Sequence, residues 1–282
     1  MSYFKDLFRR LFLSRRWIAA QFVGIALLIL VGLAWTRLSE KQVSQVVLSL
    51  LLPLLLLAAA LVLQAGTMRR LAEGETRRVG LAFAAASLLG WIAMAWAAWA
   101  ILDWCNDQIP QWAGYLTSRS SAGWRATLFT DEHIQRWLSI IEWVLRWIVV
   151  PGKIAPYAMA STLAGWRLSW RRTLRILWNW RWWPAVVLAA LAAVWLPGQF
   201  FTGEPHGTVS EQIWRLGLKL AATYLLGVGC WVLLLGWLAV LFGRQIQPPA
   251  EEVPVLVPVL TGPAEKSGSA KAEVPPDETA QS

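Results

Sequence analysis

The chain has little of what a soluble enzyme uses for chemistry. It contains two cysteines and two histidines, and only 15% of its 282 residues are charged. Cys105 and Cys230 are too few for a disulfide framework, and Cys230 lies inside an apolar run. We find no Gly-rich phosphate loop, nucleophile elbow or metal-ligand spacing, so we predict no catalytic site, no metal and no other cofactor.

Long uncharged runs take the place of such motifs. Apolar residues make up 57% of the chain, and its mean hydropathy is +0.47. Five runs without a charge are long enough to cross about 30 Å of hydrocarbon as a helix. They are Trp17–Thr36, Gln42–Met68, Val79–Leu102, Trp182–Gly203 and Leu220–Gly243. This pattern predicts an all-α fold, a polytopic transmembrane helix bundle.

The positive charge gathers at the ends of these runs. The net charge of +9 therefore fits anionic lipid headgroups better than nucleic acid, which we exclude as a partner. Excess Lys and Arg marks cytoplasmic segments, which places the N-terminus and the stretch Gly165–Pro184 inside. The chain must then cross the bilayer once between residues 103 and 166.

The predicted sixth span is Trp137–Ala160, which is less apolar than the others. Its polar residues form a stripe that can turn toward the bundle: Ser139, Glu142, Arg146 and Lys153. Glu142 and Arg146 stand four residues apart in the favourable order for an ion pair. The alternative has five spans, with residues 137–165 lying on or dipping into the outer leaflet and the arginine segment Gly165–Pro184 outside.

These assignments divide the chain into three parts. Residues 1–16 are an amphipathic N-terminal segment, residues 17–246 form the bundle, and residues 247–282 are a disordered, Pro-rich, acidic tail. Both termini are expected to be cytoplasmic in a bacterial inner membrane. Within the tail, Val253–Leu260 is either a linker or an extended docking peptide for a protein partner. The six spans are placed at about 17–36, 44–66, 80–102, 137–160, 183–201 and 220–243.

Residues 103–136 are expected to form the largest outer loop. We expect Thr130 to cap a helix that begins there, with acidic residues in its first turn. A cation site is the alternative use of the polar residues of this loop, which are Asp103, Asp107, Asp131, Glu132 and His133.

The segment 166–182 predicts an amphipathic helix that lies in the membrane interface. Gly165–Pro184 contains six tryptophans and five arginines but no acidic residue. Trp182 and Trp183 are expected to act as headgroup-level anchors. The alternative is that the rings pack against other helices. The lipid-surface candidates are Trp166, Arg167, Trp170, Arg171, Arg172, Arg175 and Trp180.

The N-terminal segment repeats this design. Its apolar face is Tyr3, Phe4, Leu7, Phe8, Leu11 and Phe12, opposed by Lys5, Arg9 and Arg10.

The motif A-x-x-L-x-x-W-R-L-S-W-R-R-T-L begins at Ala160. It resembles segments of uncharacterised multi-pass bacterial inner-membrane proteins. Over residues 156–201 the chain is also similar to the membrane domain of some glycerophosphodiester phosphodiesterases. Because the chain has no phosphodiesterase catalytic domain, this resemblance implies a membrane arrangement and not that activity.

Together these features favour a non-enzymatic integral membrane protein. It would organise or sense the cytoplasmic leaflet, or serve as the membrane partner of another protein. The alternative is a small-solute or ion transporter that uses the polar stripe of the fourth span.

Overall fold

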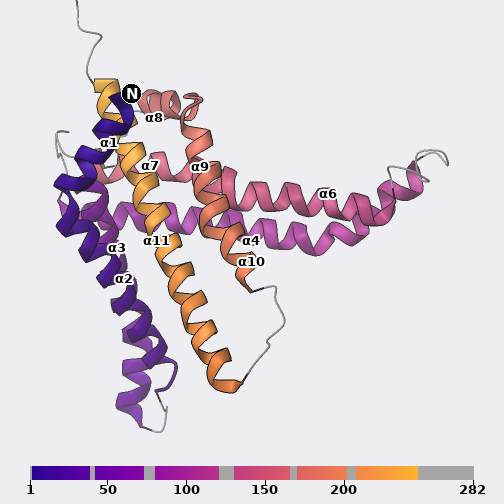
Figure 1. Cartoon of the computed structure of the whole chain (residues 1–282), viewed down its shortest axis with the longest axis horizontal. Helices are drawn as coiled ribbons and strands as arrows, with labels where there is room; N and C mark the ends of the chain where they lie inside the picture. The colour runs from indigo at the N-terminus through magenta and orange to yellow at the C-terminus, as the bar shows by residue number, and fades with distance from the viewer. Residues whose placement is uncertain are drawn as a thin grey trace, which may run out of the picture. The chain divides into compact units, whose positions relative to one another are not determined.

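A computed structural model describes residues 2–38, 42–72, 80–120, 130–165, 170–201 and 208–246 (Figure 1). Every regular element in these ranges is a helix and none is a strand, which confirms the all-α fold. The predicted tail, with Val253–Leu260, lies outside the described residues. The elements are α1 (Ser2–Leu13), α2 (Arg15–Trp35), α3 (Val43–Leu71), α4 (Leu81–Arg119), α6 (Asp131–Val144), η1 (Leu145–Val149), α7 (Val150–Ala164), α8 (Trp170–Leu177), α9 (Trp182–Ala190), η2 (Leu191–Trp195), α10 (Leu196–Phe200) and α11 (Val209–Ile246).

Five helical stretches within the described residues are long and apolar enough to cross a membrane. They contain or overlap the five uncharged runs of the sequence. The segment 137–160 is helical throughout but is not one of these five stretches, so the sixth span stays a prediction. The five stretches are Arg15–Trp35, Val43–Leu71, Leu81–Arg119, Trp182–Phe200 and Val209–Arg244.

The expected outer loop at 103–136 is wrong for most of its length. α4 continues through Asp103 to Arg119, and α6 already begins at Asp131. A charged residue ends favourable burial in lipid, but it does not interrupt the backbone hydrogen bonds of a helix. Pro110 lies inside α4 without ending it. With 39 residues α4 is about 58 Å long, so only part of it fits into about 30 Å of hydrocarbon.

α4 pairs in antiparallel fashion with the continuous helix formed by α6, η1 and α7. Figure 1 shows α4 and α6 side by side, running across the direction of α2, α3 and α11. The pair keeps nearly one register along its length, so residues 146–164 accompany the apolar part of α4. Three contacts define this register: Ser87 Oγ lies 3.3 Å from Ser161 Oγ, Trp91 stacks on Tyr157 with ring centroids 5.1 Å apart, and Asp103 pairs with Arg146.

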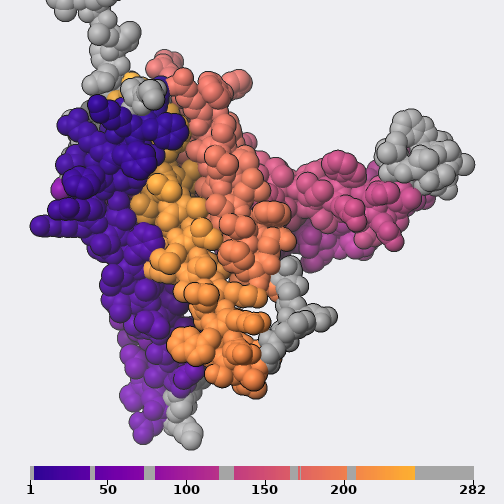
Figure 2. Space-filling model, viewed as in Figure 1, coloured from indigo at the N-terminus to yellow at the C-terminus, as the bar shows by residue number. Residues whose placement is uncertain are grey.

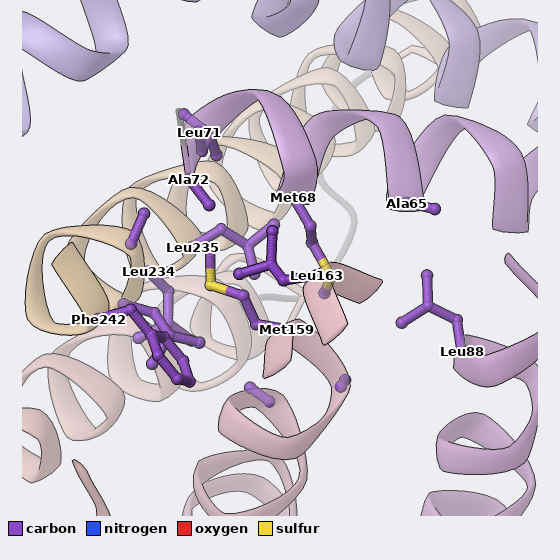
Figure 3. Packing of buried hydrophobic residues seen from close by; sticks show 14 of the residues in the cluster. Ala65, Met68, Leu71, Ala72, Leu88, Met159, Leu163, Leu234, Leu235 and Phe242 are labelled. Carbon is purple, nitrogen blue, oxygen red and sulfur yellow. The ribbon is translucent and has the colours of Figure 1, made fainter. Parts of the chain in front are cut away.

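The core gathers around α7 and the C-terminal half of α11. Figure 3 shows Met68 and Leu71 of α3, Met159 of α7, and Leu235 and Phe242 of α11 pointing toward one another; all five are at most 2% exposed. In α11, 56% of the apolar window is buried in protein, against 6% in α2. The surface of α2 therefore remains free to contact lipid, whereas α7 and α11 mainly contact protein.

Candidate functional site

α1 docks on the C-terminal half of α11. Leu7 packs against Gly236, where an added Cβ would lie 2.9 Å from the leucine Cδ1. Close to the end of α11, Arg244 Nη2 binds Asp6 Oδ2 at 2.5 Å. Figure 2 shows α11 between the surface of α1 and α2 and the surface of α9 and α10. The amphipathic N-terminal segment is thus a helix held by protein along one face.

The predicted apolar face of this segment divides into two stripes. Leu7 is buried, and Tyr3 and Leu11 are partly buried against the core. Phe4, Phe8 and Phe12 are 63%, 67% and 67% exposed, and they stand four residues apart on one side of α1. The second stripe is therefore available to lipid.

Tyr3 joins α1 to two distant parts of the chain. Its ring lies under Arg244, 3.6 Å from the guanidinium carbon, and under Arg181 at 4.5 Å. Trp237 of α11 has its ring centroid 6.0 Å from that of Tyr3, and its Nε1 donates to the Arg181 carbonyl at 3.2 Å. These contacts bring the N-terminus, residue 181 and the end of α11 into one cluster.

α8 forms part of the amphipathic helix predicted at residues 166–182. Thr173 and Ile176 are fully buried, so this face of α8 contacts protein. Arg171 and Arg175 are exposed on its other side. Trp180, after the helix, is 72% exposed.

The other lipid-surface candidates are less completely described. Trp166 and Arg167 lie outside the described residues. Trp170 and Arg172 belong to α8, but their side chains are not described.

Four exposed cations, the half-buried Arg181 and the exposed rings of these two segments define one surface. Figure 1 shows α1 and α8 near the same end of α11. We name this set of side chains the basic aromatic surface: Lys5, Arg9, Arg171, Arg175 and Arg181 with Phe4, Phe8, Phe12, Trp178 and Trp180.

Trp182 does not act as a headgroup-level anchor. Its side chain is fully buried, and Nε1 donates to the Gly152 carbonyl of α7 at 2.8 Å. Trp183 Nε1 donates to the Leu177 carbonyl at 2.9 Å. The backbone carbonyls of neighbouring segments thus provide acceptors that the sequence could not reveal, and the two rings hold α9 to α7 and to the end of α8.

The polar stripe is centred on Arg146. Its Nε lies 2.5 Å from Glu142 Oε1, which confirms the predicted pair, and its Nη2 also pairs with Asp103 of α4. Sequence reasoning missed Asp103 as a partner because the contact depends on the register between α4 and α6. Ser139 and Lys153 are exposed. Two of the four stripe residues therefore join an ion cluster that fastens two helices together.

The backbone at Arg146 is also unusual. Residues Leu145–Val149 form a π-turn in which Val150 donates to Leu145. The next donor in that pattern would be Pro151, which has no N–H. Trp99 of α4 supplies a donor instead, from Nε1 to the Arg146 carbonyl at 3.1 Å. The same spacing, L-x5-P-G, recurs where the π-turn Leu191–Trp195 precedes Pro197.

The residues proposed as an alternative cation site do not gather into one. Asp103 is engaged by Arg146, and no group of three potential metal ligands occurs among the described residues. Thr130 caps α6 as predicted, because its Oγ1 accepts from the His133 amide at 3.3 Å.

A buried polar network between α2 and α3 was not predicted. Gln21, 1% exposed, donates from Nε2 to Gln64 Oε1 at 2.7 Å. Its own Oε1 accepts from Thr67 Oγ1 at 2.8 Å. The signal in the sequence was the presence of these polar residues inside otherwise apolar runs, because polar side chains in such runs form hydrogen bonds with neighbouring helices. The network fastens α2 to α3 near the docking site of α1.

Comparison of the chain with protein-family models, curated proteins and solved structures finds no match. The resemblance over residues 156–201 therefore stays a prediction, and function has to be inferred from the chain's own residues.

Proposed function

We propose that the protein is a multi-pass, non-enzymatic protein of the bacterial inner membrane that binds and organises the anionic cytoplasmic leaflet through the basic aromatic surface. The observation that carries this proposal is the meeting of α1 and the α8–Arg181 segment on one end of α11. Segments about 170 residues apart in the sequence thus present exposed cations and exposed rings together.

The chemistry of this surface matches a lipid interface. Exposed phenylalanine and tryptophan rings gain free energy when they enter the boundary between headgroups and acyl chains. Each Lys or Arg near an anionic leaflet adds about 1 kcal/mol. A surface that combines both residue types is suited to anionic phospholipid and lacks the base-reading motifs of a nucleic-acid interface.

The proposed topology has six crossings, with both termini cytoplasmic. The register of the α4 pair links two of these crossings: if residues 81–102 cross the bilayer, residues 146–164 cross with them. The charged residues of 137–160 do not oppose a crossing, since Arg146 is paired with Glu142 and Asp103 and the α7 part of this segment is largely covered by protein. Positive charge at the α1 end then supports an inner-leaflet position for the basic aromatic surface.

Neutralising this surface should weaken the preference for anionic lipid. We expect the full chain, reconstituted in phosphatidylcholine vesicles, to bind spin-labelled phosphatidylglycerol more strongly than spin-labelled phosphatidylcholine. Changing Arg9, Arg171 and Arg175 to Gln should abolish most of that preference, because each of the three cations contributes about 1 kcal/mol. Added salt should have the same effect.

The matched control changes the same three residues to Lys, which keeps the charge and should keep the preference. Wild-type chain that binds both labelled lipids equally would overturn the proposed function. A Gln variant with the wild-type preference would do the same.

A further inference from the structure

The second inference concerns Arg181 and rests on the proposed function. The backbone of this residue is fixed at both polar groups. Its amide donates to Asn179 Oδ1 at 3.1 Å, and its carbonyl accepts from Trp237 Nε1 at 3.2 Å. The arginine is therefore held in place before any ligand arrives, which lowers the entropic cost of binding one.

The side chain of Arg181 is half-buried between aromatic residues. The guanidinium carbon lies 4.5 Å from the Tyr3 ring centroid and 5.5 Å from that of Trp180. Ring contacts use the flat face of a guanidinium, whereas its N–H groups point outward in the plane. The donors that bind an oxyanion in bidentate fashion thus remain at the edge of the group.

Arg181 also has no acidic partner within the part of the chain that the structure describes. None of the carboxylates in the described ranges lies within ion-pair distance of it. Arg244 stacks on the same Tyr3 ring but is neutralised by Asp6 at 2.5 Å. Of these two arginines in the cluster, Arg181 is the one whose positive charge is not paired with a described carboxylate.

The position of Arg181 in the chain fixes its level in the membrane. It immediately precedes Trp182–Phe200, a stretch long and apolar enough to cross the bilayer. A residue at the start of a span lies in the headgroup layer, where phosphates are concentrated. Trp180 lies beside the guanidinium, and Phe4 packs on Trp237, the residue that binds the Arg181 carbonyl. Both rings are largely exposed and can contact the glycerol and upper acyl region of the same lipid.

We propose that Arg181 binds the phosphate of one anionic phospholipid in a defined site bordered by Tyr3, Phe4 and Trp180. The lipid is held by bidentate hydrogen bonds to the guanidinium edge and by contact with the rings. This site adds a saturable component to the general attraction of the basic aromatic surface for anionic lipid.

The test is a titration of the full chain in phosphatidylcholine vesicles with spin-labelled phosphatidylglycerol. Wild type should show a saturable site above a broad, salt-sensitive preference. Arg181→Gln should weaken the saturable site about tenfold, since a charge-assisted bidentate contact is lost, and should leave most of the broad preference. Arg181→Lys should recover it only in part, because a lysine cannot form the bidentate contact. Arg136→Gln, an exposed arginine of α6, is the control and should behave as wild type.

The outcomes separate this inference from the proposed function. If wild type shows a saturable site and Arg181→Gln retains it unchanged, the Arg181 site is wrong while leaflet binding stands. If wild type has no preference for phosphatidylglycerol at all, both fail. If soluble glycerol phosphate displaces the labelled lipid with equal affinity, the site recognises a free phosphate compound and the lipid assignment is overturned. Tyr3→Leu is the second variant: it removes one ring, keeps the charge, and should weaken the site by less than Arg181→Gln does.

Discussion

Replacing Trp182 with Ala should lower the free energy of unfolding by about 4 kcal/mol, the largest effect expected of a single substitution here. The indole is fully buried and its Nε1 binds the Gly152 carbonyl of α7 at 2.8 Å. The change removes the ring, leaves a cavity between α9 and α7 and strands a buried carbonyl. Equilibrium unfolding of the full chain in detergent micelles measures the loss.

Two further tryptophan variants separate the contribution of the buried ring from that of its hydrogen bond. Trp182→Phe keeps an aromatic ring but loses the donor and part of the indole volume, so we expect a loss of about 2 kcal/mol. Trp178→Ala changes a side chain that is 87% exposed and should alter stability little in detergent. Equal stabilities for the Trp182→Ala and Trp178→Ala chains would show that α9 is not held to α7 in this way.

The second large effect is expected at Arg146. Changing it to Met leaves the carboxylates of Asp103 and Glu142 without their shared cation. Breaking a buried ion pair from one side costs 3–5 kcal/mol, but the Asp103 side chain is 65% exposed, so we expect a loss of about 2 kcal/mol. Denaturant unfolding of the variant against wild type gives the value.

A triple variant serves as the control for this cluster. Asp103→Asn and Glu142→Gln added to Arg146→Met remove the stranded charges, and most of the lost stability should return. If the triple variant is no more stable than Arg146→Met alone, the cluster does not hold α4 to α6 electrostatically. The same variants test the transporter alternative. If Arg146 or Glu142 belongs to a transport pathway, replacing it should abolish solute uptake even in a chain that still folds.

The uncharged runs predicted most of the helical framework. Residues 183–201 were expected as a span, and the helical stretch Trp182–Phe200 lies within one residue of those limits. The prediction succeeded there because a long apolar run that follows a basic segment has few alternatives to forming a membrane-spanning helix. It failed at residues 103–119, where a charged residue was taken as the end of a helix whose backbone continues.

The candidate site was predictable only in parts. The apolar and basic residues of α1 and α8 were identified from their periodicity, yet nothing in the sequence shows that Tyr3 meets Arg181 and Arg244. Such contacts depend on how α1 packs on α11. The burial of Trp182 was missed for the same reason, because its acceptor belongs to a helix thirty residues earlier.

In the proposed orientation the basic aromatic surface faces the cytoplasmic leaflet because the α4 pair crosses the bilayer. This orientation is tested by labelling single cysteines with a membrane-impermeant thiol reagent in intact cells, after Cys105 and Cys230 have been replaced by serine. We predict that Ser118→Cys, on the distal part of α4, reacts, whereas Arg175→Cys, on the exposed side of α8, reacts only after the cells are opened. Labelling of Arg175→Cys in intact cells would show that the basic aromatic surface faces outward. Protection of Ser118→Cys in intact cells would show that the α4 pair stays at the inner face.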